Sequence, residues 1–276
     1  MRLFDKVAIV GTGLIGGSIG LGLKKLRLCR EVIGVSRHKK SLTLAKKRGA
    51  IDKGSLRLDI VNSADLLILA TPVKTIMYLA PALSEIVKRD CIVTDVGSTK
   101  QEIVSALTKI FPNYVGSHPL AGSDKRSIIN ADPDMFKGTL CILTPVKNTN
   151  IRALKKLHLL WNTLGAKTVS LKPSRHDKVL ASVSHLPHVA AFALIGIVPD
   201  KYLAFASTSL RDTTRIASSD KELWADIFLS NQKNILSSIK LFQGRLNKIK
   251  SALEKRDRDK LSRILQQAKN KRDTLS

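Results

Sequence analysis

The sequence predicts an α/β domain with a doubly wound parallel sheet, followed by an all-α domain. Short apolar runs alternate with amphipathic stretches through residues 1–172, as strands alternate with crossover helices in such a sheet. The first apolar run, Val7–Val10, leads into a glycine-rich turn that opens a helix. Beyond Lys172-Pro173-Ser174 the pattern is helical to the end of the chain. We therefore expect two domains, residues 1–172 and residues 173–276.

The glycine-rich turn has the spacing of a dinucleotide-binding site, G-x-G-x-x-G. In this motif Gly11 allows the tight turn, Gly13 lets the backbone approach a pyrophosphate, and Gly16 lets the helix pack closely on the strand. The N–H groups of Leu14 and Ile15 open the helix and would face the phosphates. The alternative is a glycine-rich turn without a ligand. A second strand follows at about the distance such a site requires, which favours the dinucleotide.

The end of that second strand, Val32–Val35, indicates which dinucleotide binds. An NAD site places an acidic residue there to bond the ribose 2′-hydroxyl. This chain has Ser36 and Arg37 instead, followed by the basic run His38–Lys40. A hydroxyl beside a guanidinium can bind a 2′-phosphate, which a carboxylate would repel. We therefore predict NADP in preference to NAD, the alternative being that the basic run is only solvated surface.

The next two strands place further candidate residues. Asp65–Ala70 is typical of a buried strand and ends at Thr71-Pro72. Because ligands bind beyond the carboxyl ends of such strands, Thr71 and Pro72 should lie beside the cofactor. Cys91–Asp95 predicts another strand, followed by Ser98. Ser98 is either a functional hydroxyl or a helix cap, because Gln101 lies at the spacing of a capping box.

His118 follows another predicted strand, Tyr114–Ser117, and precedes Pro119. Proline restricts the preceding residue to an extended conformation, so the imidazole is held at a strand end. A histidine there, next to a nicotinamide site, is a candidate general base, and the alternative is a structural histidine. The other elements expected in this domain are the helices Leu14–Leu26, Ser41–Lys47, Ile76–Lys88 and Ile151–Leu164 and the strands Thr139–Thr144 and Ala166–Leu171.

A pair of histidines lies in the first part of the predicted helical domain. Ser184-His-Leu-Pro-His188 leads into Val189–Val198, which is too apolar on all sides to face water. His185 and His188 could share a helix face, but no further ligands are spaced for a metal ion, so we predict no metal site.

Two arginines and an apolar seam follow. Arg211 and Arg215 flank Asp212, and they could bind a substrate carboxylate or form an ion pair on the helix surface. Apolar residues then recur at alternating steps of four and three, which indicates packing against another helix and favours a dimer contact. The seam residues are Ile235, Ile239, Phe242, Leu246, Ile249 and Leu253.

The composition is ordinary apart from its charge. The chain has 276 residues, of which 43% are hydrophobic and 25% charged, as in soluble globular proteins. Its three cysteines are far apart, so we expect reduced thiols in a cytoplasmic protein. Residues 1–6 are too few and too polar for a signal peptide, and Val189–Val198 is too short to span a membrane.

The formal net charge of +25 raises the question of an anionic partner. Lys and Arg become most frequent after Arg245, in a segment that also contains the acids Glu254, Asp257 and Asp259. The aromatic content is only 4%, and the chain has no recognisable nucleic-acid reader motif. We therefore expect a solvated basic surface and no nucleic-acid partner.

Taken together, the motifs resemble those of the prephenate and arogenate dehydrogenases of tyrosine biosynthesis. The resemblance covers nearly the whole chain, with the motifs in order and at family-like spacing. The motifs are Gly11-x-Gly13-x-x-Gly16, Asp95-Val-Gly-Ser98, Gly116-Ser-His118-Pro-Leu-Ala-Gly122, Ser184-His-Leu-Pro-His188, Arg211-Asp-Thr-Thr-Arg215-Ile and Trp224-x-Asp226-Ile-Phe.

The resemblance implies a Rossmann-type domain and a helical domain that forms a homodimer, with the active site between them. The implied reaction is the oxidative decarboxylation of a cyclohexadienyl dicarboxylate to 4-hydroxyphenylpyruvate or tyrosine, with hydride passing to the nicotinamide. By the same resemblance, His118 bonds the ring hydroxyl and takes its proton, and Ser98 supports that hydrogen bond. A monofunctional enzyme is expected.

The resemblance also implies a set of substrate-binding residues. Arg215 would bind the ring carboxylate, and His188 and Trp224 would border the side-chain pocket. Ser184 and Arg211 are further candidates for substrate contacts.

The chain departs from the family pattern in two places. Ser209-Leu210 stands where Gly-Phe is common, and Ile128 stands where a glycine often follows the Gly122-Ser-Asp124 segment. These changes leave the roles of Asp124, Arg211 and Asp212 open. Two other functions are considered: a different reductase with a Rossmann-type and a helical domain, such as a 3-hydroxyacid dehydrogenase or an imine reductase, and an NADP-sensing protein that binds nucleic acid. The other reductases would not explain His118-Pro119, and a salt-dependent shift with duplex DNA would favour the nucleic-acid-binding protein.

Overall fold

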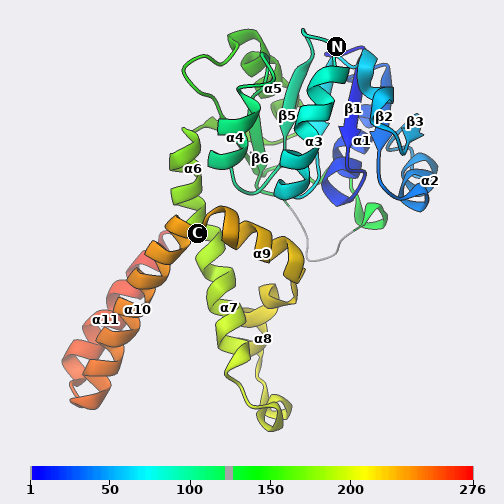
Figure 1. The fold of residues 1–276 in the computed structure, drawn as a ribbon. Coiled ribbons are helices and arrows are strands. Elements are labelled where there is room, and N and C mark those ends of the chain that lie inside the picture. Colours follow the sequence, from blue (N-terminus) through cyan, green and yellow to red (C-terminus); the bar gives the residue numbers. More distant parts are fainter. Residues whose placement is uncertain (1, 122–126, 276) are drawn as a thin grey trace.

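The computed structural model describes residues 2–121 and 127–275. Its N-terminal half contains a five-stranded sheet in the order β3-β2-β1-β4-β5, in which all strands are parallel (Figure 1). The predicted doubly wound α/β sheet is therefore confirmed. The strands are β1 (Lys6–Val10), β2 (Glu31–Val35), β3 (Lys53–Ser55), β4 (Leu66–Leu69) and β5 (Ile92–Asp95).

Successive side chains of β1 enter two different hydrophobic cores, because neighbouring residues of a strand point to opposite faces of the sheet. Val7 and Ile9 join the core under α1, α2 and α5, whereas Ala8 and Val10 join the core under α3 and α4. A strand buried on both faces has to be apolar throughout, as β1 and β4 are. The helices are α1 (Leu14–Lys25), α2 (Lys39–Lys47), α3 (Val73–Ile86), α4 (Gln101–Leu107) and α5 (Ile151–Thr163).

A second, three-stranded sheet corrects one expectation. It has the order β6-β7-β8, and a bridge between Val93 and Tyr114 connects it to β5. We expected parallel strands to continue here, but β6 is antiparallel to β7, and β8 is parallel to β7. A parallel connection usually needs a crossover helix. The described residues between β6 and β7 contain only the 3-10 turn η2. The bounds are β6 (Gly116–Pro119), η2 (Ile128–Asn130), β7 (Leu140–Thr144) and β8 (Lys167–Ser170).

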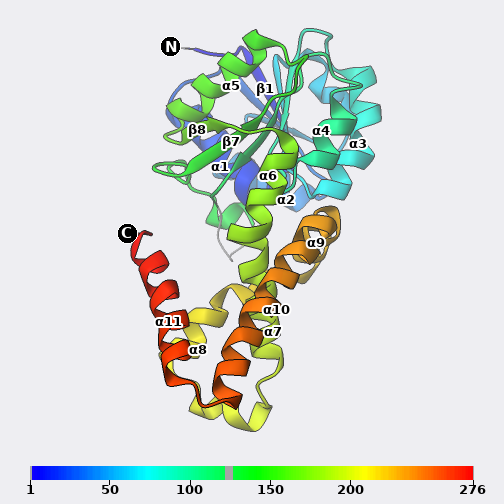
Figure 2. The ribbon, with the colours of Figure 1, turned by 90° about the vertical axis from the view of Figure 1, so that its left-hand side faces the viewer.

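One continuous helix leaves the sheet domain and enters the helical domain (Figures 1 and 2). It consists of α6 (Pro173–Leu180), a π-helical turn η3 (Ala181–His185) and α7 (Leu186–Gly196). Pro187 lacks a backbone N–H, so the α-helical ladder cannot continue through this position. The N–H of Leu186 bonds the Ala181 carbonyl oxygen instead, which widens the helix by one residue.

Shorter elements and a long helical hairpin complete the helical domain. In Figure 2 the hairpin of α10 and α11 extends away from the sheet domain. An ion pair of 2.6 Å between Lys74 Nζ on α3 and Asp226 Oδ1 on α9 joins the two halves. The elements are η1 (Leu58–Ser63) in the sheet domain and η4 (Asp200–Phe205), α8 (Thr208–Thr214), η5 (Arg215–Ser218), α9 (Lys221–Ser230), α10 (Gln232–Glu254) and α11 (Arg258–Asp273).

The helix from Pro173 to Gly196 is longer than the apolar run seen in the sequence, because α6 and α7 are continuous. By length and composition alone it could cross a membrane, with a mean hydropathy of 1.6. This is weak evidence for a span, because its first turns bury His176 and Asp177 against the sheet domain. Most apolar residues of α7 are half-buried within the chain, and Ala191 is the one that is fully buried.

Candidate functional site

A cavity of about 830 Å³ opens at the carboxyl ends of the parallel strands. It is the position at which such sheets bind dinucleotides. Residues from the glycine-rich turn, the end of β2 and the end of β4 line it together. The predicted cofactor residues among them are Gly11, Gly13, Ser36, Arg37, Thr71 and Pro72.

The three glycines of the turn have the backbone geometry that the motif predicts. Gly11 has φ +102°, and a Cβ there would lie 2.4 Å from the Ala70 carbonyl oxygen. A Cβ on Gly16 would lie 2.0 Å from the Gly11 carbonyl oxygen, so Gly16 serves close packing and does not line the cavity. Around Gly13 a Cβ would meet no atom within 4 Å, which leaves the space that a pyrophosphate needs.

The first turn of α1 offers free donors to a phosphate. The N-cap is Gly13, which has no side chain to cap the helix, so the N–H groups of Leu14 and Ile15 are left for a ligand. Two hydroxyls add to this surface. Thr12 Oγ1 and Thr71 Oγ1 are the buried side-chain oxygens without a hydrogen-bond partner in the described residues, and both threonines line the cavity. Orphaned buried donors beside an open glycine turn fit a bound dinucleotide.

The end of β2 is positively charged. The Ser36 hydroxyl accepts a hydrogen bond from the His38 N–H at 3.2 Å, and its own proton remains available to a ligand. Arg37 is exposed at the cavity, and α2 begins directly after it with no acid in its first turn. No carboxylate is found among the cavity-lining residues that the structure describes. This charge pattern suits an anion at the ribose.

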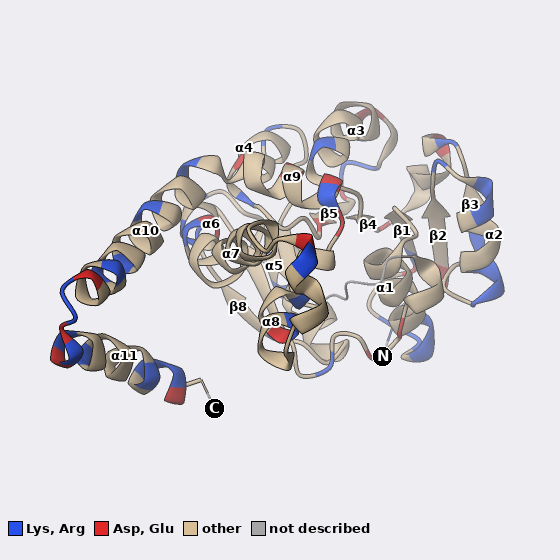
Figure 3. Cartoon of the chain, turned by 90° about the horizontal axis from the view of Figure 1, so that it is seen from below, with Lys and Arg blue, Asp and Glu red and all other residues tan. Residues whose placement is uncertain are grey.

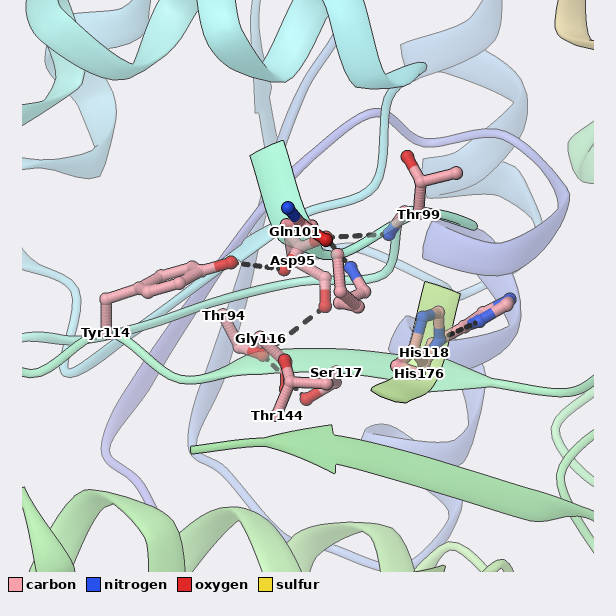
Figure 4. Close-up of polar contacts among 12 residues, drawn as sticks. Thr94, Asp95, Thr99, Gln101, Tyr114, Gly116, Ser117, His118, Thr144 and His176 are labelled. Carbon is pink, nitrogen blue, oxygen red and sulfur yellow. Dashed lines mark hydrogen bonds and ion pairs between the residues drawn. The ribbon is translucent and has the colours of Figure 1, made fainter. Parts of the chain in front are cut away.

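His118 lies on β6 and is the first member of a hydrogen-bonded chain of side chains (Figure 4). His118 Nδ1 lies 2.8 Å from His176 Nε2, and His176 Nδ1 lies 2.7 Å from Asp177 Oδ1. His176 and Asp177 come from the first turns of α6 and are buried. Burial and the neighbouring His176, Lys100 and His185 hold the pKa of His118 well below its usual range. At neutral pH His118 is therefore an unprotonated base.

His176 and Asp177 were not among the site residues predicted from the sequence. The only local signal was an adjacent His-Asp pair in the first turns of a helix that directly follows the predicted boundary. Their importance comes from a contact across 58 residues, which no local pattern reveals.

Ser98 is not the helix cap that its spacing suggested. Helix α4 begins at Gln101, and its N-cap, Lys100, has no capping side chain of its own. The carboxylate of Asp177 caps the helix from a distance, with Oδ1 2.8 Å from Lys100 N and Oδ2 2.9 Å from Gln101 N. Ser98 lies half-buried in the loop between β5 and α4, and its hydroxyl has no hydrogen bond to the described residues.

A buried polar cluster holds this loop and β6 in place. Lys100 and Asp95 are both 0% exposed and form an ion pair, and Tyr114 donates its hydroxyl to Asp95 Oδ1 at 2.7 Å (Figure 4). On the other side of β6, Thr94 bonds Ser117 at 2.7 Å, and the Trp161 indole donates to Ser117 at 3.1 Å. Because these buried groups are paired, they position the strand that carries the catalytic candidate.

On the helical side, His188 and Trp224 meet as a stacked pair. Their ring centroids are 3.4 Å apart, and the rings are inclined by 22°. His188 Nδ1 donates to the Ser184 carbonyl oxygen at 3.0 Å, so its Nε2 is directed elsewhere. His185 packs edge-on against Trp224 at 6.1 Å, and Asn231 Nδ2 lies 3.1 Å from His185 Nδ1. The structure thus brings together three of the predicted pocket residues.

Arg211 and Arg215 form no hydrogen bond with this histidine cluster in the described residues. Both are exposed, on α8 and η5, which pack against α7. The ion pair that we considered for them is wrong for residues 2–121 and 127–275, because neither guanidinium pairs with an acid there. No described hydrogen bond connects Arg215 with His118. Both guanidiniums are therefore available to an anionic ligand.

Two further expectations concern the rest of the chain. Asp124, whose role we left open, lies outside the described residues. The three cysteines are buried and unpaired, as predicted. Within the described ranges, no group of histidine, cysteine and acidic residues is arranged to hold a metal ion.

Comparisons with known proteins agree on one family. A family model described as the prephenate dehydrogenase nucleotide-binding domain matches residues 19–170, and one described as the prephenate dehydrogenase dimerization domain matches residues 172–267. The chain is 34% identical over 286 residues to the prephenate dehydrogenase of Bacillus subtilis (strain 168), which covers 99% of this chain and 77% of that protein.

Two solved structures are similar along their whole length. The prephenate dehydrogenase of A. aeolicus in complex with hydroxyphenyl propionate and NAD+ has a TM-score of 0.94 and 34% identity, covering 99% of this chain and 98% of that chain. The arogenate dehydrogenase of Synechocystis has a TM-score of 0.85 and 29% identity, covering 98% and 100%. Together with the two domain matches, these similarities show that the chain belongs to the prephenate dehydrogenase family.

Proposed function

We propose that this chain is an NADP-preferring dehydrogenase of prephenate or arogenate, which carries out an oxidative decarboxylation to 4-hydroxyphenylpyruvate or tyrosine. The observation that carries the proposal is a neutral, half-buried histidine, His118, which is fixed on a strand by a hydrogen bond to His176. A base of this kind suits the removal of a hydroxyl proton at neutral pH. Family membership supports the same reaction.

His118 has a simple part in the proposed chemistry. Its Nε2 accepts the proton of the ring hydroxyl, and the oxygen gains alkoxide character, which favours the departure of hydride from the same carbon. The bound nicotinamide accepts that hydride, and the ring carboxylate leaves as carbon dioxide when the ring becomes aromatic. In the same proposal Ser98 supports the hydrogen bond between His118 and the hydroxyl.

The substrate-binding part of the proposal uses the helical domain. Arg215 binds the ring carboxylate, and Arg211 adds positive charge nearby. His188, stacked on Trp224, and Ser184 border the pocket for the substrate side chain. The exposed guanidiniums of Arg211 and Arg215 would attract a dicarboxylate.

The preference for NADP is supported by the cavity. Ser36 and Arg37 line it, and no carboxylate occurs among its described lining residues. The N–H groups of Leu14 and Ile15 would hold the pyrophosphate through the first turn of α1, with Gly11 and Gly13 giving the approach and Gly16 letting the helix pack closely on the turn. The related A. aeolicus structure contains NAD+, so the preference for NADP is argued from the residues of this chain and not from that relative.

Assembly and location complete the proposal. We expect a cytoplasmic homodimer formed through the helical domain, with residues 1–172 binding NADP and residues 173–276 binding substrate and partner. The match to a family dimerization domain and the uncovered apolar side chains of α10 support the dimer.

One assay tests the proposed function. The purified protein is incubated with prephenate or arogenate and with NADP+ or NAD+, and reduced cofactor and carbon dioxide are measured. We expect turnover with at least one substrate and a higher kcat/KM with NADP+. His118→Asn should lower kcat by about 100-fold or more with little effect on cofactor affinity. If neither substrate is turned over, the assignment fails, and near-normal kcat in His118→Asn would exclude His118 from the chemistry.

A further inference from the structure

His176 is wholly buried and yet polar, and all of its hydrogen-bonding capacity is used by the site. Its exposed fraction is 0% and that of Asp177 is 1%. Buried polar side chains in folded proteins almost always have hydrogen-bond partners. Here the partners form a single line from Asp177 through His176 to His118, with N···O and N···N distances of 2.7 and 2.8 Å.

The protons of this line can be assigned from the carboxylate end. Asp177 accepts hydrogen bonds from the backbone N–H groups of Lys100 and Gln101, at the N-terminus of α4. Because both carboxylate oxygens of Asp177 accept hydrogen bonds, the short contact between Asp177 Oδ1 and His176 Nδ1 requires a proton on His176 Nδ1.

The assignment continues to His118. Burial lowers the pKa of His176, so its ring is neutral at pH 7 and its Nε2 carries no proton. His176 Nε2 can then only accept, and His118 Nδ1 must donate to it. A neutral His118 with a proton on Nδ1 has a free lone pair on Nε2. That nitrogen is the one that a general base needs.

We propose that His176 is a positioning residue for His118, which fixes both the direction of its ring and the tautomer whose Nε2 takes the proton of the substrate hydroxyl. Asp177 fixes His176 in turn. The inference deepens the proposed function and rests on it for the identity of the proton donor. In the step itself, the substrate O–H bond breaks, an N–H bond forms on His118 Nε2, and the Nδ1 proton stays in its hydrogen bond to His176.

The charges around His118 explain why such support is needed. Lys100, paired with Asp95, faces it from the start of α4, and His185 faces it from the π-helical turn. Both neighbours oppose a positive charge on the His118 ring. Asp177 is the carboxylate on the far side of His176, so it partly offsets that charge when His118 is protonated.

Two substitutions of His176 separate the proposed role from a merely structural one. His176→Leu removes the acceptor and should lower kcat by about 10- to 100-fold, with KM changed less than about threefold, because ground-state contacts to substrate remain. His176→Gln keeps an amide oxygen near the position of Nε2 and should restore most of kcat. His158→Leu is the matched control, because among the described residues His158 bonds only Thr168 and Ser170, on the far edge of the second sheet. The kcat of this variant should equal that of the wild type.

A double-mutant comparison tests whether His176 acts through His118. In a His118→Asn background, His176→Leu should cause no further loss of kcat, because the residue that it positions is gone. The same fold loss in both backgrounds, or a wild-type kcat in His176→Leu, would overturn the inference. If the wild type turns over neither substrate, the proposed function fails.

A measurement without turnover keeps the two failures distinguishable. The imidazole ¹⁵N resonances of His118 report which ring nitrogen is protonated. We expect the Nδ1–H tautomer in the wild type and in His176→Gln, and a mixture or the Nε2–H tautomer in His176→Leu. An Nε2–H tautomer in the wild type would refute the positioning role even if the enzyme is active.

Discussion

The proposed preference for NADP depends on the side chain of Ser36. The hydroxyl at the end of β2 can donate to a 2′-phosphate, whereas an acidic residue there would repel it. The substitution Ser36→Asp should therefore raise the KM for NADP+ by roughly 10- to 100-fold, since a hydrogen bond to a charged group contributes about 1.5–3 kcal/mol. The KM for NAD+ should fall or stay constant, as measured by initial rates with both cofactors.

The control for this substitution adds the same charge on the neighbouring helix α2. Thr43→Asp lies on the exposed side of α2, outside the cavity-lining residues, and should leave the ratio of the two KM values unchanged. If Ser36→Asp also leaves that ratio unchanged, the 2′-phosphate is bound elsewhere or not at all.

Arg215 is exposed and forms no ion pair in the described chain, so its removal should affect substrate more than folding. We expect Arg215→Ala to raise the KM for the dicarboxylate by about tenfold or more, because a guanidinium bonds a carboxylate through two parallel hydrogen bonds. The melting temperature should remain within about 1 °C of the wild type. An unaltered KM, determined from initial rates at saturating cofactor, would contradict the assignment.

The residues of the site differ in how far the sequence could identify them. His118 was predicted because Pro119 fixes its backbone locally, and the glycines were predicted because their spacing is itself the signal. Ser98 was ambiguous because its capping pattern is genuine, but the Asp177 carboxylate, 77 residues beyond Lys100, takes the capping position instead. Contacts of this kind depend on the fold as a whole, which a single sequence does not display.

At the scale of elements, the π-helical turn η3 buries His185 against Trp224 and Asn231. Burial lowers the pKa of His185 from an ordinary 6.5 to about 4 in the folded protein. The unfolded chain therefore binds more protons than the folded chain between these values, and stability falls as the pH falls through this window. At about 1.4 kcal/mol per pKa unit, His185 contributes roughly 3 kcal/mol above pH 6.5 that is lost near pH 4.

Denaturant unfolding between pH 7 and 4 measures this effect. His118 and His176 act in the same direction, since burial lowers their pKa values as well. The substitution His185→Gln should reduce the dependence of the unfolding free energy on pH without abolishing it. A stability that is constant from pH 6.5 to pH 4 would mean that these histidines are accessible to water.

The elements themselves were predicted better where burial shaped the pattern. The apolar strands β1 and β4 were evident from composition alone. The edge strand β3 was missed because its residues are mostly exposed and carry no alternation. The antiparallel pairing of β6 was also missed, because strand direction depends on the path of the connecting chain and not on the strand residues.

At the scale of the whole molecule, apolar side chains on α10 remain uncovered within one chain. Leu246 is 48% exposed and Leu253 is 59% exposed, although both belong to the seam predicted from the sequence. Figure 3 shows Lys and Arg spread along α10 and α11, with Asp and Glu near the turn between the two helices and at the end of α11. The apolar stripe on α10 suits a second copy of the chain better than a nucleic acid.

Dimerisation can be tested on this stripe. The substitution Leu246→Asp should convert the dimer to a monomer. A two-fold symmetric interface contains the substitution twice, and each unpaired carboxylate would be buried in an apolar contact, at a cost of several kcal/mol. Light scattering coupled to size exclusion gives the mass. Leu159→Asp, on α5 in the sheet domain and 42% exposed, is the control and should leave the mass unchanged. A dimer that persists in Leu246→Asp would move the interface away from α10.

The unbroken helix from Pro173 to Gly196 restricts how this molecule can move. Its first part, α6, carries His176, which bonds His118 on β6. Its second part, α7, carries His188, which is proposed to border the substrate side chain. Because the helix belongs to both domains, the domains cannot move relative to each other unless the helix bends. Bending would change the spacing between His176 and His188. We therefore expect the spacing between His176 and His188 to stay constant when substrate binds.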